Sequence, residues 1–293
     1  ATRTATRTAT PTRTLTPTAT PTATMVPDQW RAGAGLPGDQ VNTLWPFQST
    51  CDAAYAGLDN AGVYRTLDGG DTWSHRGLGV SVLSLAAVPW NDSNVYAATW
   101  GTGVWHSTNG GTDWSAMNNG LGGNLYLYAI EMDAEHNTLY VGTGSAGVYK
   151  SINGGSLWQP VNTGLTDLNV RCLAIDPQSG QSVAYAGTLS GLFKTTDGGQ
   201  TWQPIGPAKV RIRDIAIEPG NHNIIYLATD DGVYRSPDGG ETWPGNTHKI
   251  IGFRVNVIAF GHHRESVVFA PVVGCPDLRR HFFGRYFALW DHS

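Results

Sequence analysis

A few polar and aromatic residues in this sequence have the chemistry to bind a ligand. Arg171 and Arg213 each stand near the start of an apolar segment, and two guanidinium groups can hold one anionic group between them. Trp100 lies in a short polar segment, where its ring is a candidate for stacking on a sugar or a peptide. The adjacent carboxylates of Asp230 and Asp231 offer oxygen ligands to a cation.

Each candidate also has a structural interpretation. Arg213 can pair with the neighbouring Asp214 or other acids and fill the centre of the fold, and Trp100 can be ordinary packing. Two adjacent carboxylates without further ligands are weak evidence for a cation site, and the nine histidines show no metal-binding spacing. We therefore expect no metal and no cofactor. Tyr128 and Asp214, near the starts of apolar segments, complete the candidate ligand-binding set.

An internal repeat predicts the elements that position these residues. Five octapeptides share a Ser or Thr, then an Asp or Asn, a Gly-Gly pair and a Trp. Asp and Asn side chains accept backbone N–H groups in tight turns, and glycines supply positive φ angles, so each octapeptide predicts a structural hairpin turn. The five pairs of turn residues are Asp68 and Trp73, Asn109 and Trp114, Asn153 and Trp158, Asp197 and Trp202, and Asp238 and Trp243.

The spacing of these turns predicts the fold. Successive turn tryptophans lie 41, 44, 44 and 41 residues apart. Four strands of about six residues, with connections of about five, account for a period of about 44 residues. A four-stranded antiparallel unit of this length, repeated in tandem, is typical of a propeller blade. The sequence therefore predicts an all-β protein, a β-propeller.

The two ends of the repeat region decide the number of blades. Trp30 lies 43 residues before Trp73, and residues 26–36 resemble the segment that follows each turn. We predict that residues 26–36 form the outer strand of a blade whose inner strands come from residues 254–260 and 266–270, which gives six blades. A longer parent chain would have seven or more. Residues 271–293 lack the turn motif and form either a divergent closing segment or a basic, aromatic docking segment.

The octapeptides match the Asp-box, or BNR, motif Ser/Thr-x-Asp-x-Gly-x-x-Trp. From about residue 26 to about residue 260 the chain resembles the Asp-box β-propeller superfamily. That superfamily includes sialidases, xyloglucan-cleaving endoglucanases, the sortilin ectodomain and photosystem II assembly-factor propellers. The resemblance implies that Asp boxes lie on the face away from the ligand. It places ligands among the loops that enter the inner strands and those that join the second strand to the third.

The features of the enzymes in this superfamily are mostly missing. Sialidases clamp a carboxylate with three arginines and usually carry an Arg-Ile-Pro tripeptide, which does not occur here. A xyloglucanase cleft needs two propellers. Only two arginines occur among the six residues that our alignment places at one inner-strand position, namely Asn42, Leu83, Leu127, Arg171, Arg213 and Asn256.

The short loops between second and third strands predict a shallow surface, which also argues against an enzyme. We therefore predict a non-catalytic propeller that binds a glycan, a peptide or a protein partner. The alternative is a glycoside hydrolase, sialidase-like or other, with an atypical site on the face opposite the Asp boxes. Its carboxylates would come from Asp59, Asp214, Asp230 and Asp231.

Composition outside the repeats predicts the setting of the protein. In residues 1–25 Thr alternates with Ala, Arg and Pro, a low-complexity pattern typical of a disordered stalk or linker that carries O-linked sugars. We therefore expect a secreted or cell-surface protein with its propeller in residues 26–293, and we expect a monomer.

The net charge of −4 argues against a nucleic-acid partner, and no apolar run is long enough to span a membrane. The cysteines Cys51, Cys172 and Cys275 are expected to be buried thiols.

Overall fold

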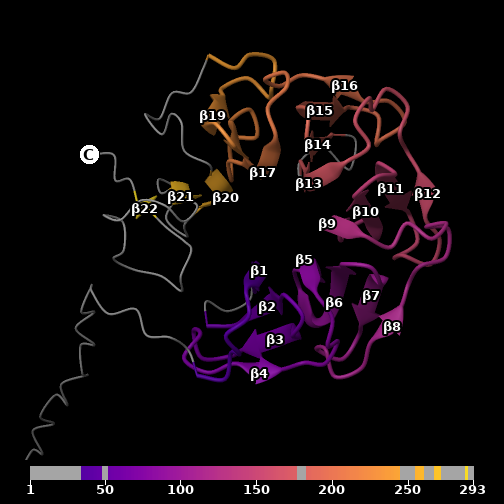
Figure 1. The fold of residues 1–293 in the computed structure, drawn as a ribbon, viewed down its shortest axis with the longest axis vertical. Coiled ribbons are helices and arrows are strands. Elements are labelled where there is room, and N and C mark those ends of the chain that lie inside the picture. Colours follow the sequence, from indigo (N-terminus) through magenta and orange to yellow (C-terminus); the bar gives the residue numbers. More distant parts are fainter. Residues whose placement is uncertain are drawn as a thin grey trace, which may run out of the picture. The chain divides into compact units, whose positions relative to one another are not determined.

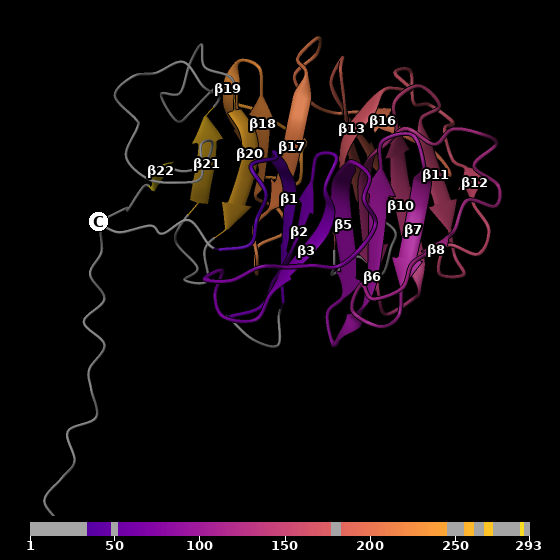
Figure 2. The ribbon, with the colours of Figure 1, turned by 60° about the horizontal axis from the view of Figure 1, so that its bottom comes forward.

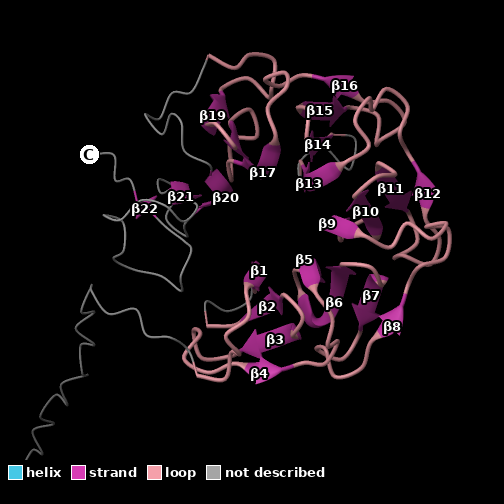
Figure 3. Cartoon of the chain, in the orientation of Figure 1, coloured by secondary structure: helices cyan, strands magenta, loops and turns pink. Residues whose placement is uncertain are grey.

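The computed structural model describes residues 34–47, 52–176, 183–244, 255–260, 267–271 and 288–289. The chain divides into two units, Ala1–Trp30 and Arg31–Ser293, and all described residues lie in the second unit. These residues form strands, turns and loops, and no helix occurs among them (Figure 3). The predicted stalk and residues 26–33 of the predicted N-terminal outer strand lie outside the described residues, as does most of segment 271–293.

Six antiparallel sheets follow one another along this unit, each built from consecutive strands. The first strands are β1 (Val41–Pro46), β5 (Val82–Val88), β9 (Leu127–Asp133), β13 (Val170–Ile175), β17 (Ile212–Ile217) and β20 (Val255–Phe260). The second strands are β2 (Ala54–Leu58), β6 (Asn91–Thr99), β10 (Thr138–Thr143), β14 (Ala184–Thr188), β18 (Ile225–Thr229) and β21 (Val267–Pro271). The third strands are β3 (Gly62–Thr66), β7 (Gly103–Ser107), β11 (Val148–Ser151), β15 (Leu192–Thr195), β19 (Gly232–Ser236) and β22 (Ala288–Leu289). The described fourth strands are β4 (Ser74–His75), β8 (Ser115–Ala116), β12 (Gln159–Pro160) and β16 (Gln203–Pro204).

Within this unit the sheets are the blades of a propeller. The first strands lie at the centre and the fourth strands at the rim (Figure 1), and successive first strands pack against one another from β1 to β20. Viewed from the side, the inner strands stand next to one another as neighbouring layers (Figure 2). The prediction of an all-β propeller with antiparallel blades is confirmed for five blades, which begin with β1, β5, β9, β13 and β17.

The fourth strands are much shorter than predicted. Each has two residues, where the period suggested about six, and both residues are exposed. A rim strand pairs on one side only and buries little apolar area. The chain then leaves the sheet to start the next blade, so that pairing beyond two residues has little to stabilise it.

Each Asp-box octapeptide forms a hydrogen-bonded turn, as the first of them shows. The hydroxyl of Thr66 donates to Asp68 at 2.8 Å and accepts the N–H of Gly70 at 2.9 Å. Asp68 in turn accepts the N–H of Thr72 at 2.9 Å, and Gly69 and Gly70 have φ angles of +71° and +96°. Hydrogen bonds from Thr72 and Thr66 lower the pKa of Asp68 to about 2. This carboxylate is therefore charged and held within its own turn.

The turn tryptophans connect neighbouring blades. Four of the five indole N–H groups donate to a backbone carbonyl of the preceding blade. These bonds, all 2.7 Å long, run from Trp114 to Arg76, Trp158 to Met117, Trp202 to Val161 and Trp243 to Ile205. In the opposite direction, tyrosine hydroxyls of second strands donate to glycine carbonyls of the next Asp box, from Tyr96 to Gly154, Tyr140 to Gly198 and Tyr185 to Gly239.

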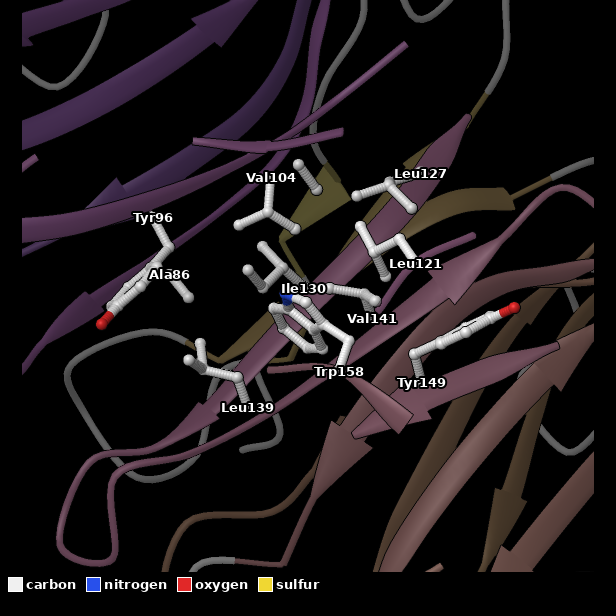
Figure 4. Packing of buried hydrophobic residues seen from close by; sticks show 11 residues of the cluster. Ala86, Tyr96, Val104, Leu121, Leu127, Ile130, Leu139, Val141, Tyr149 and Trp158 are labelled. Atoms are coloured by element: carbon white, nitrogen blue, oxygen red, sulfur yellow. The ribbon is translucent and has the colours of Figure 1, made fainter. Parts of the chain in front are cut away.

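The hydrophobic core lies between blades. In the cluster shared by the second and third blades, the Trp158 ring packs with Ile130 and Leu139 (Figure 4). Trp158 is only 1% exposed. Alanine recurs at the fifth position of four inner strands, and Ala86 is fully buried there. The third blade carries Glu131 at this position instead.

Candidate functional site

The face opposite the Asp boxes, here called the mouth face, is built from short turns. At the end of four second strands a buried threonine donates its hydroxyl to the carbonyl of the glycine that leads into the third strand. These bonds run from Thr99 to Gly103 at 2.6 Å, Thr143 to Gly147 at 2.9 Å, Thr188 to Gly191 at 2.9 Å and Thr229 to Gly232 at 2.8 Å. The turns are therefore tight, in agreement with the short loops expected from sequence.

Trp100 lies at the tip of one such turn, in the second blade, and it is fixed to the third. Its backbone N–H donates to the carbonyl of Ser81 at 2.9 Å, and the Trp100 backbone forms an antiparallel bridge with that of Tyr126. The Trp100 ring stands edge-on to the rings of Tyr126 and Tyr128, with centroids 5.0 Å and 5.2 Å away. Trp100 is 46% exposed and Tyr126 is 54% exposed. The backbone thus presents exposed aromatic rings in a fixed arrangement.

Arg171 extends this arrangement into the fourth blade. Its guanidinium carbon lies 3.8 Å from the centre of the Tyr128 ring, well within the range of a cation–π contact. Among the described residues Arg171 has no ion pair, and its buried Nε has no hydrogen-bond partner. We call Trp100, Tyr126, Tyr128 and Arg171 the aromatic–arginine cluster. Sequence reasoning named three of these residues but did not predict that they meet.

The contact between Arg171 and Tyr128 corrects the alignment made from sequence. That alignment placed Leu127 at the position of Arg171 and Arg213. In the structure Leu127 pairs with Thr143 at a β-bulge, just as Val170 pairs with Thr188 before Arg171. Tyr128 therefore holds the arginine position in the third blade. The same register shift follows the first residue of the other inner strands, so Leu127 corresponds to Val170, one position before the one assigned from sequence.

Arg213 has a different environment from Arg171. Its Nε donates to Asp230, and the Nε of Arg211 lies 3.9 Å from the other oxygen of the same carboxylate. The structural alternative, pairing of Arg213 with an acid, thus describes its observed contact, with Asp230 as the partner rather than Asp214. Asp231 accepts a long hydrogen bond of 3.4 Å from the hydroxyl of Tyr234. Among the described residues no group of three His, Cys, Asp or Glu is placed to hold a metal ion.

Two acidic residues of the inner strands have raised pKa values. The carboxylate of Asp214 accepts the N–H groups of Ile215 at 2.9 Å and Ile258 at 2.8 Å, yet burial raises its pKa to about 7. Burial, with the charge of Asp214 adding to it, raises the pKa of Glu131 to about 8. Cys172 is a free buried thiol whose pKa is also raised by burial. We call Glu131 and Asp214 the inner acids.

Sequence reasoning missed two of the residues described above. Tyr126 precedes its strand and lay outside the inner-strand alignment, although the alternation in Tyr126-Leu127-Tyr128 was a usable signal. Glu131 was not among the candidate residues chosen from the sequence. Its presence at a position where four other inner strands have alanine was the signal that marks it as unusual.

Comparison with protein-family models identifies the family. Residues 120–289 match the model described as photosynthesis system II assembly factor YCF48. The chain belongs to this family of BNR-type β-propellers. No curated protein sequence gave a significant match. The described part of the chain has no helix with the length and hydropathy of a membrane span.

Solved structures show the same fold at low sequence identity. A xyloglucanase of family GH74 from Xanthomonas campestris matches with a TM-score of 0.68 and 20% identity, over 85% of this chain and 44% of its own. YCF48 from Cyanidioschyzon merolae matches with a TM-score of 0.57 and 17% identity, over 76% and 78%. YCF48 bound to D1 peptide matches with a TM-score of 0.54 and 16% identity, over 87% and 94%. The chain thus spans less than half of the xyloglucanase.

Proposed function

We propose that this protein is a non-catalytic binding propeller that holds a glycan, a peptide or a protein partner on its mouth face. The observation that carries the proposal is the aromatic–arginine cluster. Two large rings, Trp100 and Tyr126, are about half exposed although their backbone is fixed by hydrogen bonds. Arg171 stands beside them without an ion pair among the described residues. Covering these rings with a ligand removes apolar surface from water at little cost in conformational entropy.

The comparisons support a binding role without assigning the partner. One similar structure is titled as YCF48 bound to D1 peptide, so a propeller of this family binds a polypeptide. At 16% identity this similarity supports a shared fold and does not identify a shared partner. The partner of the present chain is therefore proposed from its own cluster.

A glycoside hydrolase is the second candidate, and the inner acids are the observation in its favour. Paired carboxyl groups with raised pKa values are found in many active sites. However, both oxygens of Asp214 already accept backbone N–H groups, which is a structural use. The mouth-face candidates Asp59 and Asp230 are also engaged, by Ser81 at 2.6 Å and by Arg213. Hydrolysis of a glycan that is lost in Glu131→Gln would favour this candidate over ours.

We also propose that the ring has six blades, closed by residues 26–36. Ala34 occupies the same place as Asn119 and Thr163, since each accepts the N–H of the turn tryptophan that follows it, at 2.8 to 2.9 Å. Asn119 and Thr163 follow the outer strand of the preceding blade, so the chain before Ala34 is expected to be such a strand. Leu44 agrees with this: it is 56% exposed, whereas Leu85 at the same position is 2% exposed. Among the described residues Leu44 thus leaves apolar surface of β1 exposed, which a closing blade would cover.

The setting we propose is the cell exterior. The support is compositional: a Thr- and Pro-rich segment before the propeller is typical of a glycosylated stalk. Such a stalk would hold the mouth face away from the surface that carries it.

The binding proposal is tested with the purified full chain on glycan and peptide arrays. We expect hits that weaken in Trp100→Ala and in Arg171→Ala. The matched control is Trp90→Ala, which removes a 66% exposed tryptophan from the turn that joins β5 and β6, at the other end of the blade. Hits that persist in both cluster variants would exclude the mouth-face site. An array with no hits at all would count against a binding module for these ligands.

A further inference from the structure

The backbone around the aromatic–arginine cluster limits how a ligand can bind. The N–H groups of Trp100, Gly101 and Gly144 all donate to carbonyls of neighbouring segments, at 2.9 to 3.0 Å. Extended peptides commonly bind by adding a strand to a sheet edge whose N–H and C=O groups are free. Here these N–H groups already donate to carbonyls of the chain itself. Recognition at this site therefore depends on side chains, and a ligand that binds through its own side groups or rings suits the site better than a peptide added as a strand.

The side chains offer flat, fixed apolar surfaces. Trp100 and Tyr126 meet at 72°, and the turns that carry them are held by the bridge between these two residues. A pyranose ring has a flat C–H face that matches an aromatic ring, while its hydroxyl groups stay in water. The tight turns of the mouth face suit a chain of sugars that lies across the surface.

Arg171 adds a charge requirement to this site. Its guanidinium carbon lies over the Tyr128 ring, 3.8 Å from the ring centre, and this contact holds the charge beside the aromatic rings. It has no ion pair among the described residues, in contrast to Arg213, whose partner is Asp230. A fixed guanidinium without a counter-ion is matched by a carboxylate, which accepts two of its N–H groups at once.

We propose that the aromatic–arginine cluster binds an acidic oligosaccharide, with a hexuronate ring stacked on Trp100 or Tyr126 and its carboxylate on Arg171. This inference rests on the proposed binding function and names the ligand class. In a hexuronate the carboxylate is attached directly to the sugar ring. One sugar unit therefore offers a flat face to an aromatic ring of the cluster and a negative charge to Arg171.

The experiment is calorimetry on the full chain with three probes: a galacturonate hexamer, its methyl ester, and an acetylated hexapeptide of alternating Asp and Tyr. The ester keeps the sugar rings and removes the charge. We expect the acid to bind roughly tenfold more tightly than the ester, since a hydrogen bond to a charged group is worth about 1.5–3 kcal/mol. Arg171→Gln should abolish this difference, and Trp100→Ala should weaken both sugars.

Two variants serve as controls. Arg235→Gln removes another guanidinium that lies over a tyrosine, 5.8 Å from the Tyr226 ring centre, and Trp90→Ala removes an exposed tryptophan outside the cluster. Both should keep the preference for the acid. Equal binding of acid and ester, or a preference for the peptide, would overturn the acidic-sugar inference and leave the binding function standing. If no sugar binds while the array yields peptide hits that depend on Trp100, the ligand class is wrong. If the arrays also yield none, the proposed function fails with it.

Discussion

The two faces of this propeller differ in how regular they are. On the Asp-box face the same bonds recur from blade to blade: hydroxyl to carboxylate or amide, glycine N–H to hydroxyl, and indole N–H to the preceding blade. On the mouth face the threonine caps recur, but the side chains around them change. Trp100 and Tyr126 have no aromatic counterpart in the other blades, and an arginine stands at the position of Arg171 in only two of the described blades. Repetition therefore identifies the scaffold, and departure from repetition identifies the candidate site.

The largest effect is expected from breaking the regular face. Trp158→Ala should lower the free energy of unfolding by about 3–5 kcal/mol, because the ring is buried between two blades and a cavity remains. Urea denaturation measures this loss. Trp90→Ala, at a 66% exposed position, should change stability by less than about 1 kcal/mol.

Trp158→Phe covers the case in which the alanine variant does not fold. It keeps most of the apolar volume and removes the 2.7 Å bond from the indole to Met117. It should cost roughly 1–3 kcal/mol, the range for a buried acceptor that loses its partner. A Trp158 variant as stable as the wild type would show that the connections between blades are dispensable.

The raised pKa values of the inner acids should make the free energy of unfolding depend on pH, by several kcal/mol at most. Folding raises the pKa of Glu131 from 4.5 to about 8 and that of Asp214 from 3.8 to about 7. Between these limits the folded state binds more protons than the unfolded state, so stability is full below about pH 4 and falls as the pH rises to about 8. Thermal melts at pH 5 and pH 8 should show this decline, and Glu131→Gln should reduce it. The same slope in both proteins would rule out Glu131 as its source.

The regularity of the Asp-box face explains what could be predicted from sequence. The five turns, the period and the short mouth-face loops follow from local patterns, because glycines, Asp or Asn, and tryptophan act within a few residues of one another. The contact of Arg171 with Tyr128 depends on the register between two adjacent inner strands, and the contact of Trp100 with Tyr126 depends on which segments of adjacent blades lie together. The raised pKa values of the inner acids depend on how deeply the folded chain buries them. These are properties of the closed fold, and no local pattern contains them.

A moderate effect is expected from changing the cluster's shape without removing its side chains. A Cβ atom at Gly144 would lie 3.1 Å from the Tyr128 ring. Gly144→Ala should therefore displace this ring, disturb its contact with Arg171 and weaken ligand binding several-fold. Stability should change little, because the ring is only partly buried. Gly38→Ala is the matched control, since no atom lies within 4 Å of its added Cβ. Unchanged binding in Gly144→Ala would show that the contact between Tyr128 and Arg171 is not needed.

The smallest effect sharpens the difference between the two mouth-face arginines. Arg213 is paired with Asp230, whose side chain is 41% exposed, and ion pairs of this kind are worth about 1 kcal/mol or less. Arg213→Gln should therefore lower the free energy of unfolding by about 1 kcal/mol or less. It should leave ligand affinity nearly unchanged, because the Arg213 charge is already paired. Arg171→Gln should lose the carboxylate-dependent binding, because its charge has no counter-ion among the described residues. Equal losses in the two variants would mean that both arginines contact the ligand, as the fork expected from sequence requires. A larger loss in Arg171→Gln than in Arg213→Gln would place the ligand on the aromatic side of the mouth face, over the second to fourth blades.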